Sequence, residues 1–291
     1  MVKEKYSDYL KFIDDALELA KALPKQFSKF SNRIYCNHQK LCIYVLMQKL
    51  KTTTRGVISY LHSSSEMRFH LGLTRVPVHT TLVRFVKRIP KYLFQLFSIR
   101  KADTVAVDAT GFELESKSYY YRTVWNSDRK KKTKKFMKLN LAVDKKQRRI
   151  LSYKIWKSRA HESRDFIELL KDLKVKYVVA DAGYSSKKLR DFVIYKLKAL
   201  PFIPKKKTEG VYRFRGRRIL KFEEKKYHRR SNIENVFSCI KRKYGAVLRN
   251  RTAATQKVEV ISKLVAHNVD ILQHYLLLIW RGLHHHPFLC L

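Results

Sequence analysis

The hydrophobic pattern of the chain changes near residue 103, and this change restricts the possible fold more than any other feature. From about residue 5 to residue 100, apolar side chains recur at helical spacing, as in Tyr6, Leu10, Ile13 and Leu17. Beyond residue 103 the apolar runs are short and typical of strands, and later ones alternate with amphipathic segments. These runs cover residues 104–109, 118–124, 136–143, 149–156, 176–181 and 199–203. The order predicts an α+β fold, in which a mixed sheet is flanked by helices.

Helices are predicted between and after these strands, at residues 166–173, 185–197 and 255–282, and a basic hairpin at 211–220. The expected domains are a helical region (1–100), a catalytic domain (101–250) and a helical tail (251–291).

Within the first region, a helix that begins near Thr52 and a helix over 78–88 are separated by a Gly-containing turn at 71–77. This arrangement fits a helix-turn-helix that binds DNA, although the turn is long for that motif. An ordinary helical bundle with a basic surface is the alternative.

The charge of the chain predicts a polyanionic partner. Lysine and arginine number 64 against 24 aspartate and glutamate residues, which gives a net charge of +40 over 291 residues. Nucleic acid is the expected partner, because phosphate contacts release counterions and so add affinity. A membrane surface is disfavoured, since the charge is spread along the chain rather than gathered on one amphipathic helix. The four cysteines show no paired spacing, and the charged start of the chain is unlike a signal peptide, so a reducing cytosol is expected.

Three acidic residues lie where they can form a metal site. Asp108 and Asp181 each follow an apolar strand-like run, and Glu234 lies on a predicted helix with a buried side. On that helix, at about 100° per residue, Arg230, Glu234, Lys241 and Tyr227 fall within about 60° of one another. Carboxylate oxygens on a sheet and an adjoining helix suit Mg²⁺ or Mn²⁺. Two such ions can support phosphoryl transfer at a phosphodiester.

Each of these residues also has a structural interpretation. An aspartate that ends a strand is often a helix cap or a turn residue, and Arg230 and Glu234, four apart, can form a helix ion pair. The functional interpretation is that Arg230 and Lys241 contact phosphates beside the scissile bond. Tyr227 then stacks on a base or binds a phosphate.

The spacing Tyr227-x2-Arg230-x3-Glu234-x6-Lys241 resembles the signature of DDE transposases encoded by bacterial and archaeal insertion sequences, in the large group numbered four and five. Other segments resemble blocks of that group in the same order. These are residues 107–111 (VDATG), 138–144 (KLNLAVD), 180–184 (ADAGY) and 159–162 (RAHE), the last containing His161. The resemblance covers residues 75–250 well.

The resemblance implies a ribonuclease H-like, retroviral-integrase-like catalytic domain behind a helical DNA-binding region. It implies that Asp108, Asp181 and Glu234 are the catalytic, metal-binding triad, with Mg²⁺ or Mn²⁺, two ions, as cofactor. The implied activity is cleavage at the terminal inverted repeats of an insertion sequence and joining of the 3′-hydroxyl ends to target DNA. Candidate DNA contacts are Tyr227, Arg229, Arg230, Lys241 and Lys138.

The partners expected from the resemblance are double-stranded DNA, both element ends and target, and further copies of the chain. A homodimer or larger synaptic complex is expected because transposition brings two ends together, and no membrane is involved. The expected location is the cytoplasm, on the nucleoid of a prokaryote.

Some positions depart from the pattern of the group. Ala109 and Asn140 stand where serine and histidine are common, and the 53-residue step from Asp181 to Glu234 leaves room only for a short hairpin. Two alternatives stay open at this point. One is a metal-dependent nuclease of the same fold, and the other is a catalytically inactive, domesticated DNA-binding protein.

Overall fold

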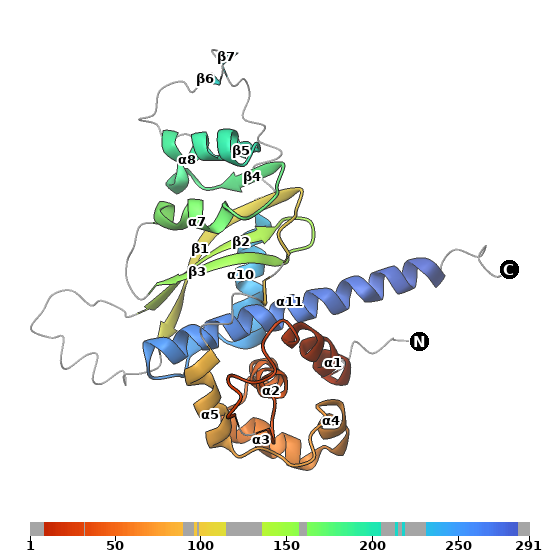
Figure 1. The fold of residues 1–291 in the computed structure, drawn as a ribbon. Helices are drawn as coiled ribbons and strands as arrows, with labels where there is room; N and C mark the ends of the chain where they lie inside the picture. The colour runs from red at the N-terminus through yellow and green to blue at the C-terminus, as the bar shows by residue number, and fades with distance from the viewer. Residues whose placement is uncertain are drawn as a thin grey trace, which may run out of the picture. The chain divides into compact units, whose positions relative to one another are not determined.

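A computed structural model describes residues 9–31, 33–89, 96–97, 99–114, 136–156, 162–204, 213–214, 217–218 and 231–284. The chain forms two compact units (Figure 1). We call residues 97–242 and 246–253 the sheet unit, and residues 1–96, 243–245 and 254–291 the helical unit. Each unit is described by itself.

The sheet unit is built on a mixed sheet with the strand order β3-β2-β1-β4-β5. The strands are β1 (Thr104–Leu114), β2 (Phe136–Asp144), β3 (Ile150–Trp156), β4 (Tyr177–Ala180) and β5 (Leu200–Phe202). The first three pair antiparallel, whereas β4 and β5 add in parallel. A short strand that the sequence did not predict, β8 (Val247–Leu248), pairs in parallel with the end of β1. The other predicted strands are confirmed, while 118–124 lies outside the described residues.

Helices cover one face of this sheet with an apolar core. The core joins Val105 and Val107 of β1 to Phe166 and Leu170 of helix α7 (Phe166–Leu170) and to Val193. Shorter turns complete this layer: η3 (Glu162–Asp165), η4 (Ala182–Tyr184), α8 (Lys187–Asp191) and the π-helical η5 (Phe192–Lys196). The predicted helices at 166–173 and 185–197 are therefore present in shorter pieces.

Helix α10 (Ser231–Tyr244) carries the apolar face that the sequence predicted. Its residues Ile233, Val236, Phe237, Ile240 and Tyr244 are all buried. The basic hairpin is also confirmed: β6 (Arg213–Phe214) pairs antiparallel with β7 (Arg217–Arg218).

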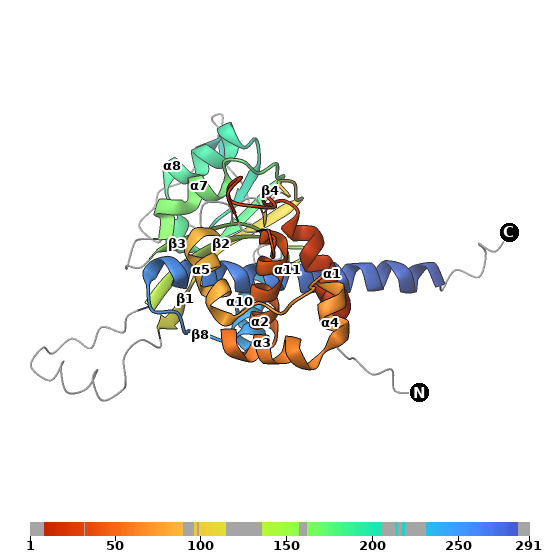
Figure 2. The same ribbon diagram turned by 60° about the horizontal axis from the view of Figure 1, so that its bottom comes forward.

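The helical unit consists of α1 (Tyr9–Ala20), α2 (Asn37–Lys49), α3 (Thr54–Ser63), α4 (Ser65–His70), α5 (His79–Arg88) and α11 (Ala253–His284), which Figures 1 and 2 show from two sides. The helices near Thr52 and over 78–88 are present as α3 and α5. However, the short helix α4 stands between them, so they are not consecutive. Helix α11 matches the helix predicted at 255–282. Across the described ranges, no helix combines the length and the apolar character that a bilayer span needs.

Asp270 of α11 holds the helical unit together from inside. Its carboxylate accepts hydrogen bonds from Lys49 Nζ of α2 at 2.5 Å, from Lys243 Nζ at 3.0 Å and from Tyr244 Oη at 2.7 Å. Burial raises the pKa of this carboxyl, but the hydrogen bonds from Lys49 and Tyr244 and the two ammonium charges outweigh burial and lower the pKa overall. This acid is neutralised within the protein.

Candidate active site

Strand pairing places Asp108 and Asp181 side by side. Strands β1 and β4 run parallel, with Val107 opposite Ala180, and each aspartate is the next residue along the chain, Asp108 within β1 and Asp181 directly after β4. Neighbouring strands lie roughly 4.8 Å apart, so the two carboxylates start from adjacent backbone positions. The sequence suggested that Asp108 ends its strand. This was wrong, because β1 continues to Leu114. Asp108 marks instead the point where pairing with β4 stops.

Each aspartate accepts a hydrogen bond from the backbone N–H of the residue that follows it. Asp108 Oδ1 accepts a hydrogen bond from Ala109 N at 2.8 Å, and Asp181 Oδ1 accepts one from Ala182 N at 2.5 Å. Asp181 is the N-cap of η4, so the capping interpretation of this residue is also correct. Both side chains are half-buried. These hydrogen bonds orient both carboxylates and do not exclude a second role.

Side-chain alternation puts both aspartates on the face of the sheet that α10 covers. Val105 and Val107 of β1 and Ala180 of β4 point into the core under α7. Because successive side chains of a strand point to opposite faces, Asp108, Thr110 and Asp181 point to the other face. Lys241 of α10 meets that face, where its Nζ donates to Thr110 Oγ1 at 2.7 Å.

The Lys241–Thr110 hydrogen bond also fixes the direction of α10 along β1. After α10 the chain enters β8, where Val247 pairs with Glu113, so residues 241 to 247 advance in the direction of β1. Going back from Lys241 to Glu234 therefore leads from Thr110 toward Asp108. Seven helical residues span about 10.5 Å and two strand residues about 6.6 Å, which brings Glu234 to roughly the level of Asp108.

Glu234 is exposed and belongs to the first turn of α10. A carboxylate in the first turn is stabilised by the helix dipole. Half-burial of Lys241 lowers the pKa of its ammonium group, while the charge of Glu113 opposes this shift. Its Nζ also lies 5.8 Å from the centre of the Phe112 ring.

The donor set fits a hard cation, although the three side chains do not close around one position. Asp108, Asp181 and Glu234 offer carboxylate oxygens, the ligands that Mg²⁺ and Mn²⁺ prefer. Among the described residues, no three acidic, histidine or cysteine side chains come within reach of a single metal ion. The backbone therefore brings two aspartates together and directs the helix with Glu234 toward them. The three carboxylates do not meet at one position among the described residues.

The other predicted site residues divide into two groups. Tyr227, Arg229 and Arg230 lie outside the described residues, as does His161. Lys138 pairs with Gly111 on β2, and alternation places it on the face opposite Asp108. Its predicted DNA contact stays a prediction, and it is not part of the group formed by Asp108, Asp181 and Lys241.

Two features of the site region were not found from the sequence. Thr110 is the residue that receives Lys241, and nothing in a strand sequence distinguishes such a threonine from an ordinary β-branched residue. On the other face, buried Asp165 accepts hydrogen bonds from Asn140 Nδ2 at 2.6 Å and from Trp156 Nε1. This network connects η3 to β2 and β3, and it gives Asn140 a structural role.

Comparison with known proteins defines the class of protein. The chain resembles the structure of a piggyBac transposase synaptic complex with hairpin DNA, with a TM-score of 0.51 and 9% sequence identity over 94% of this chain and 76% of that chain. At this identity the likeness concerns the fold. The fold is thus ribonuclease H-like, an α+β arrangement of a mixed sheet flanked by helices, as the sequence predicted.

The family is shown by the sequence itself. The family model described as the transposase DDE domain matches residues 99–269, more than half of the 291-residue chain. The chain therefore belongs to the transposase DDE domain family. No curated protein matches it.

Proposed function

We propose that this chain is an active DNA transposase. It cuts DNA at the terminal inverted repeats of its own insertion sequence and joins the freed 3′-hydroxyl ends to target DNA. The chain's place in the transposase DDE domain family supports this proposal. The observation that carries it is the register of β1 with β4, which aligns Asp108 and Asp181 on the face that meets α10.

Asp108, Asp181 and Glu234 are the residues that would hold the metal. Bound Mg²⁺ or Mn²⁺, proposed as two ions, would supply charge stabilisation at the scissile phosphate and lower the pKa of an attacking water. The three carboxylates would hold and orient these ions. Lys241, which donates a hydrogen bond to Thr110 on the same face, is proposed to contact a DNA phosphate, and Arg230 is proposed to bind a second one.

The proposed reaction has two steps, and neither changes an oxidation state, so no redox cofactor is needed. Water first attacks a phosphodiester at the element end, which leaves a 5′-phosphate and a 3′-hydroxyl. That 3′-hydroxyl then attacks a target phosphodiester, forms a new one and displaces a target 3′-oxygen. Both steps are phosphoryl transfers in which positioning and charge stabilisation provide most of the rate.

An end-cleavage assay tests the proposal. The purified chain is incubated with labelled DNA that carries the native flanks of its own gene, with Mg²⁺ or Mn²⁺, beside Glu234→Ala. The control is Asp172→Ala, which removes an exposed acid from the same unit. We expect a discrete metal-dependent cut at a repeat boundary in the wild type and the control, and none in Glu234→Ala.

Adding a target plasmid separates transposition from simple cleavage. Joined products that carry the element terminus support a transposase, whereas cutting without joining supports a nuclease of the same fold. Binding of both proteins with no cut in either, on paired ends and with either metal, would contradict the catalytic proposal. A synaptic homodimer or larger complex is part of the proposal, and sedimentation that shows only monomers on paired-end DNA would contradict that part.

A further inference from the structure

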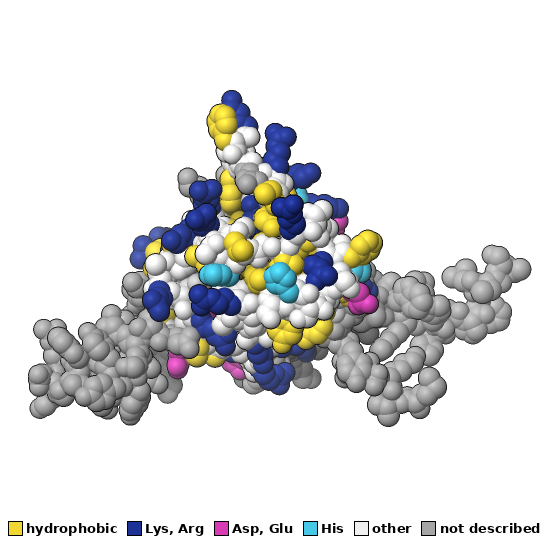
Figure 3. Space-filling model, turned by 90° about the horizontal axis from the view of Figure 1, so that it is seen from below, with side chains coloured by type: hydrophobic (Ala, Val, Ile, Leu, Met, Phe, Trp, Pro, Cys, Tyr) yellow, Lys and Arg dark blue, Asp and Glu magenta, His cyan; other side chains and the backbone are white. Residues whose placement is uncertain are grey.

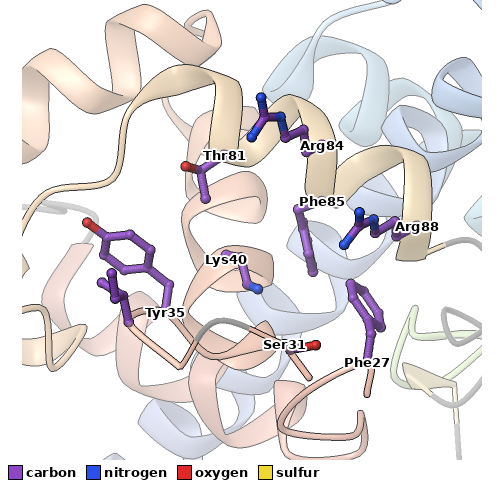
Figure 4. Close-up of a pocket in the computed structure, with 9 residues that line it drawn as sticks. Phe27, Ser31, Tyr35, Lys40, Thr81, Arg84, Phe85 and Arg88 are labelled. Carbon is purple, nitrogen blue, oxygen red and sulfur yellow. The ribbon is translucent and has the colours of Figure 1, made fainter. Parts of the chain in front are cut away.

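A basic pocket of about 350 Å³ opens in the helical unit, between α2, α5 and the segment before α2 (Figure 4). We call it the α2–α5 pocket. Its polar lining includes Lys40, Thr81, Arg84 and Arg88, and its apolar lining includes Phe27 and Phe85. Of the residues that the structure describes, no acidic one lines it.

Lys40 is held in place at the pocket by aromatic rings. Phe27 and Phe85 stack with their centres 5.9 Å apart and an interplanar angle of 26°. Lys40 Nζ lies 5.9 Å from the centre of the Phe27 ring and 5.6 Å from that of Phe85. In Figure 4 these two rings stand on one side of Lys40 and Tyr35 on the other. Cation–π contacts of this kind position an ammonium group without neutralising it.

Helix α5 adds cations to the same pocket. Arg84 and Arg88 are four residues apart and Thr81 is three residues before Arg84, so all three share one side of α5. Burial lowers the pKa of the Lys40 ammonium; Cys36 acts in the opposite direction, and the charge of Arg88 lowers it further. Within the described ranges, no ion pair links Lys40, Arg84 or Arg88 to an acid. Three cationic side chains therefore line one pocket, and the charge of Arg88 already acts on Lys40, so a bound anion would offset this repulsion.

We propose that the α2–α5 pocket binds a phosphate group of the DNA backbone, which deepens the proposed function by assigning a second DNA contact site. Arg84 and Arg88 have the fork geometry that pairs with phosphate oxygens, while Lys40 supplies a point charge and Thr81 a hydroxyl donor. The volume is large enough for a phosphate with part of its sugar. Contacts of this kind fix the position of a protein on DNA and carry no base sequence.

This assignment differs from the helix-turn-helix interpretation of the same region. A recognition helix reads base edges in the major groove, so its variants change sequence preference. The side of α5 with Arg84 and Arg88 instead lines a pocket that Lys40 of α2 also lines. Figure 3 shows lysine and arginine side chains scattered over one face of the molecule, where aspartate and glutamate side chains are sparse.

The test measures the salt dependence of binding to a random-sequence duplex of about 30 base pairs. The variants are Arg84→Gln, Arg88→Gln and the double variant. The matched control is Lys87→Gln, which removes an equal charge from the same helix at an exposed position outside the pocket. Each phosphate contact contributes about 0.9 to the slope of log K against log salt. We expect the slope to fall by about 0.9 in each single variant and about 1.8 in the double variant.

At 0.15 M salt one such contact is worth roughly fivefold in affinity, relative to 1 M salt. Circular dichroism confirms that each variant is folded. Equal slopes for Lys87→Gln and Arg88→Gln would overturn the proposal, because charge alone would then explain the loss. The same loss toward a polyglutamate peptide but not toward DNA would overturn it as well, in favour of an acidic protein partner.

Acylation of Lys40 gives a second readout. With acetic anhydride and mass spectrometry, the duplex is expected to protect Lys40 in the wild type and to protect it less in the double variant. Lys40 labelling that DNA does not change would contradict the proposal. These binding measurements do not depend on cleavage. The pocket proposal can therefore fail while the catalytic variants behave as expected, and the transposase proposal can fail while the pocket still binds DNA.

Discussion

Buried or half-buried acids have different neighbours in the two units. In the helical unit, Asp270 is enclosed by Lys49, Lys243 and Tyr244, which all donate to its carboxylate. In the sheet unit, Asp108 and Asp181 lie next to each other on parallel strands, a pairing of like charges. An acid that is neutralised by its own chain stabilises the fold. Two carboxylates held side by side offer adjacent oxygen ligands of the kind that a divalent cation prefers.

The α2–α5 pocket shows the same principle with the opposite sign. Lys40, Arg84 and Arg88 line one pocket, and no acid is among its described lining residues, whereas Asp108 and Asp181 are neighbours on the sheet. In a chain with a net charge of +40, cations at the surface need no explanation, but cations brought together around a cavity do. Like-charge groups are therefore the places where we propose that ligands bind, a metal ion in one unit and a phosphate in the other.

The largest effect is expected from the paired aspartates. Asp108→Asn and Asp181→Asn should each lower the rate of end cleavage by roughly a thousandfold, because a metal supplies several kcal/mol and each 1.36 kcal/mol is tenfold. DNA affinity and stability should change little. Single-turnover cleavage measures the rate, and urea denaturation measures the stability. Asp103→Asn, an exposed acid just before β1, is the control, and a similar loss of rate in it would remove the distinction between these acids.

Asp270→Ala should produce the opposite result, a loss of stability. The substitution leaves Lys49, whose side chain is 11% exposed, without its carboxylate, and breaking such a buried pair costs about 3–5 kcal/mol. Amide exchange in α11 should accelerate at least about a hundredfold. Glu168→Ala removes a surface acid that pairs with Lys154 and Lys171, and its cost should stay below about 1 kcal/mol. Equal costs would show that Asp270 is not a special case.

The pH dependence of stability should identify Asp270 as well. Its pKa is lowered in the folded state, so its contribution is present above the unfolded value of about 3.9 and is lost as the pH falls through the folded pKa. The urea midpoint of the helical unit should therefore fall below about pH 4. Asp270→Asn should begin lower and show a flatter profile over the same range. Parallel profiles would assign the acid sensitivity to other carboxylates.

Much of the sheet unit could be predicted because its elements carry strong local patterns. The apolar run before Asp108 and the apolar side of α10 are visible in the sequence, since burial on one face imposes its own period. The burial of Ile233, Val236 and Ile240 followed directly from that period. Asp108 and Asp181 could be assigned to one site from the sequence because an apolar strand-like run precedes each of them. The parallel register that makes them neighbours, and the continuation of β1 beyond Asp108, could not be predicted.

The rest depends on contacts between residues far apart in the sequence. Strand β8 has two residues and no pattern of its own, and its pairing depends on the end of β1. The Lys241–Thr110 hydrogen bond joins residues 131 positions apart, and the α2–α5 pocket combines Lys40 with Arg84 and Arg88 across two helices. Local periodicity contains no information about such pairs. The division of α10 between two units is hidden from the sequence for the same reason.

The smallest effect, and the sharpest test of how α10 is placed, is expected from Thr110→Val. Valine keeps the shape and the strand preference of threonine but removes the oxygen that accepts from Lys241 Nζ. The half-buried ammonium loses a hydrogen bond worth about 1.5 kcal/mol, so end cleavage should fall roughly tenfold if that bond fixes Lys241 on the DNA phosphate. Thr110→Ser restores the acceptor and should recover most of the rate. If valine and serine give the same rate, the bond does not position α10, and Glu234 must reach the aspartates by another constraint. If the Thr110→Val variant alone is slow, and its stability to urea is nearly unchanged, the hydrogen bond from Lys241 to Thr110 matters for cleavage and not for folding. DNA cleavage at Asp108 and Asp181 then depends on the position of the Lys241 ammonium group, which β1 itself fixes.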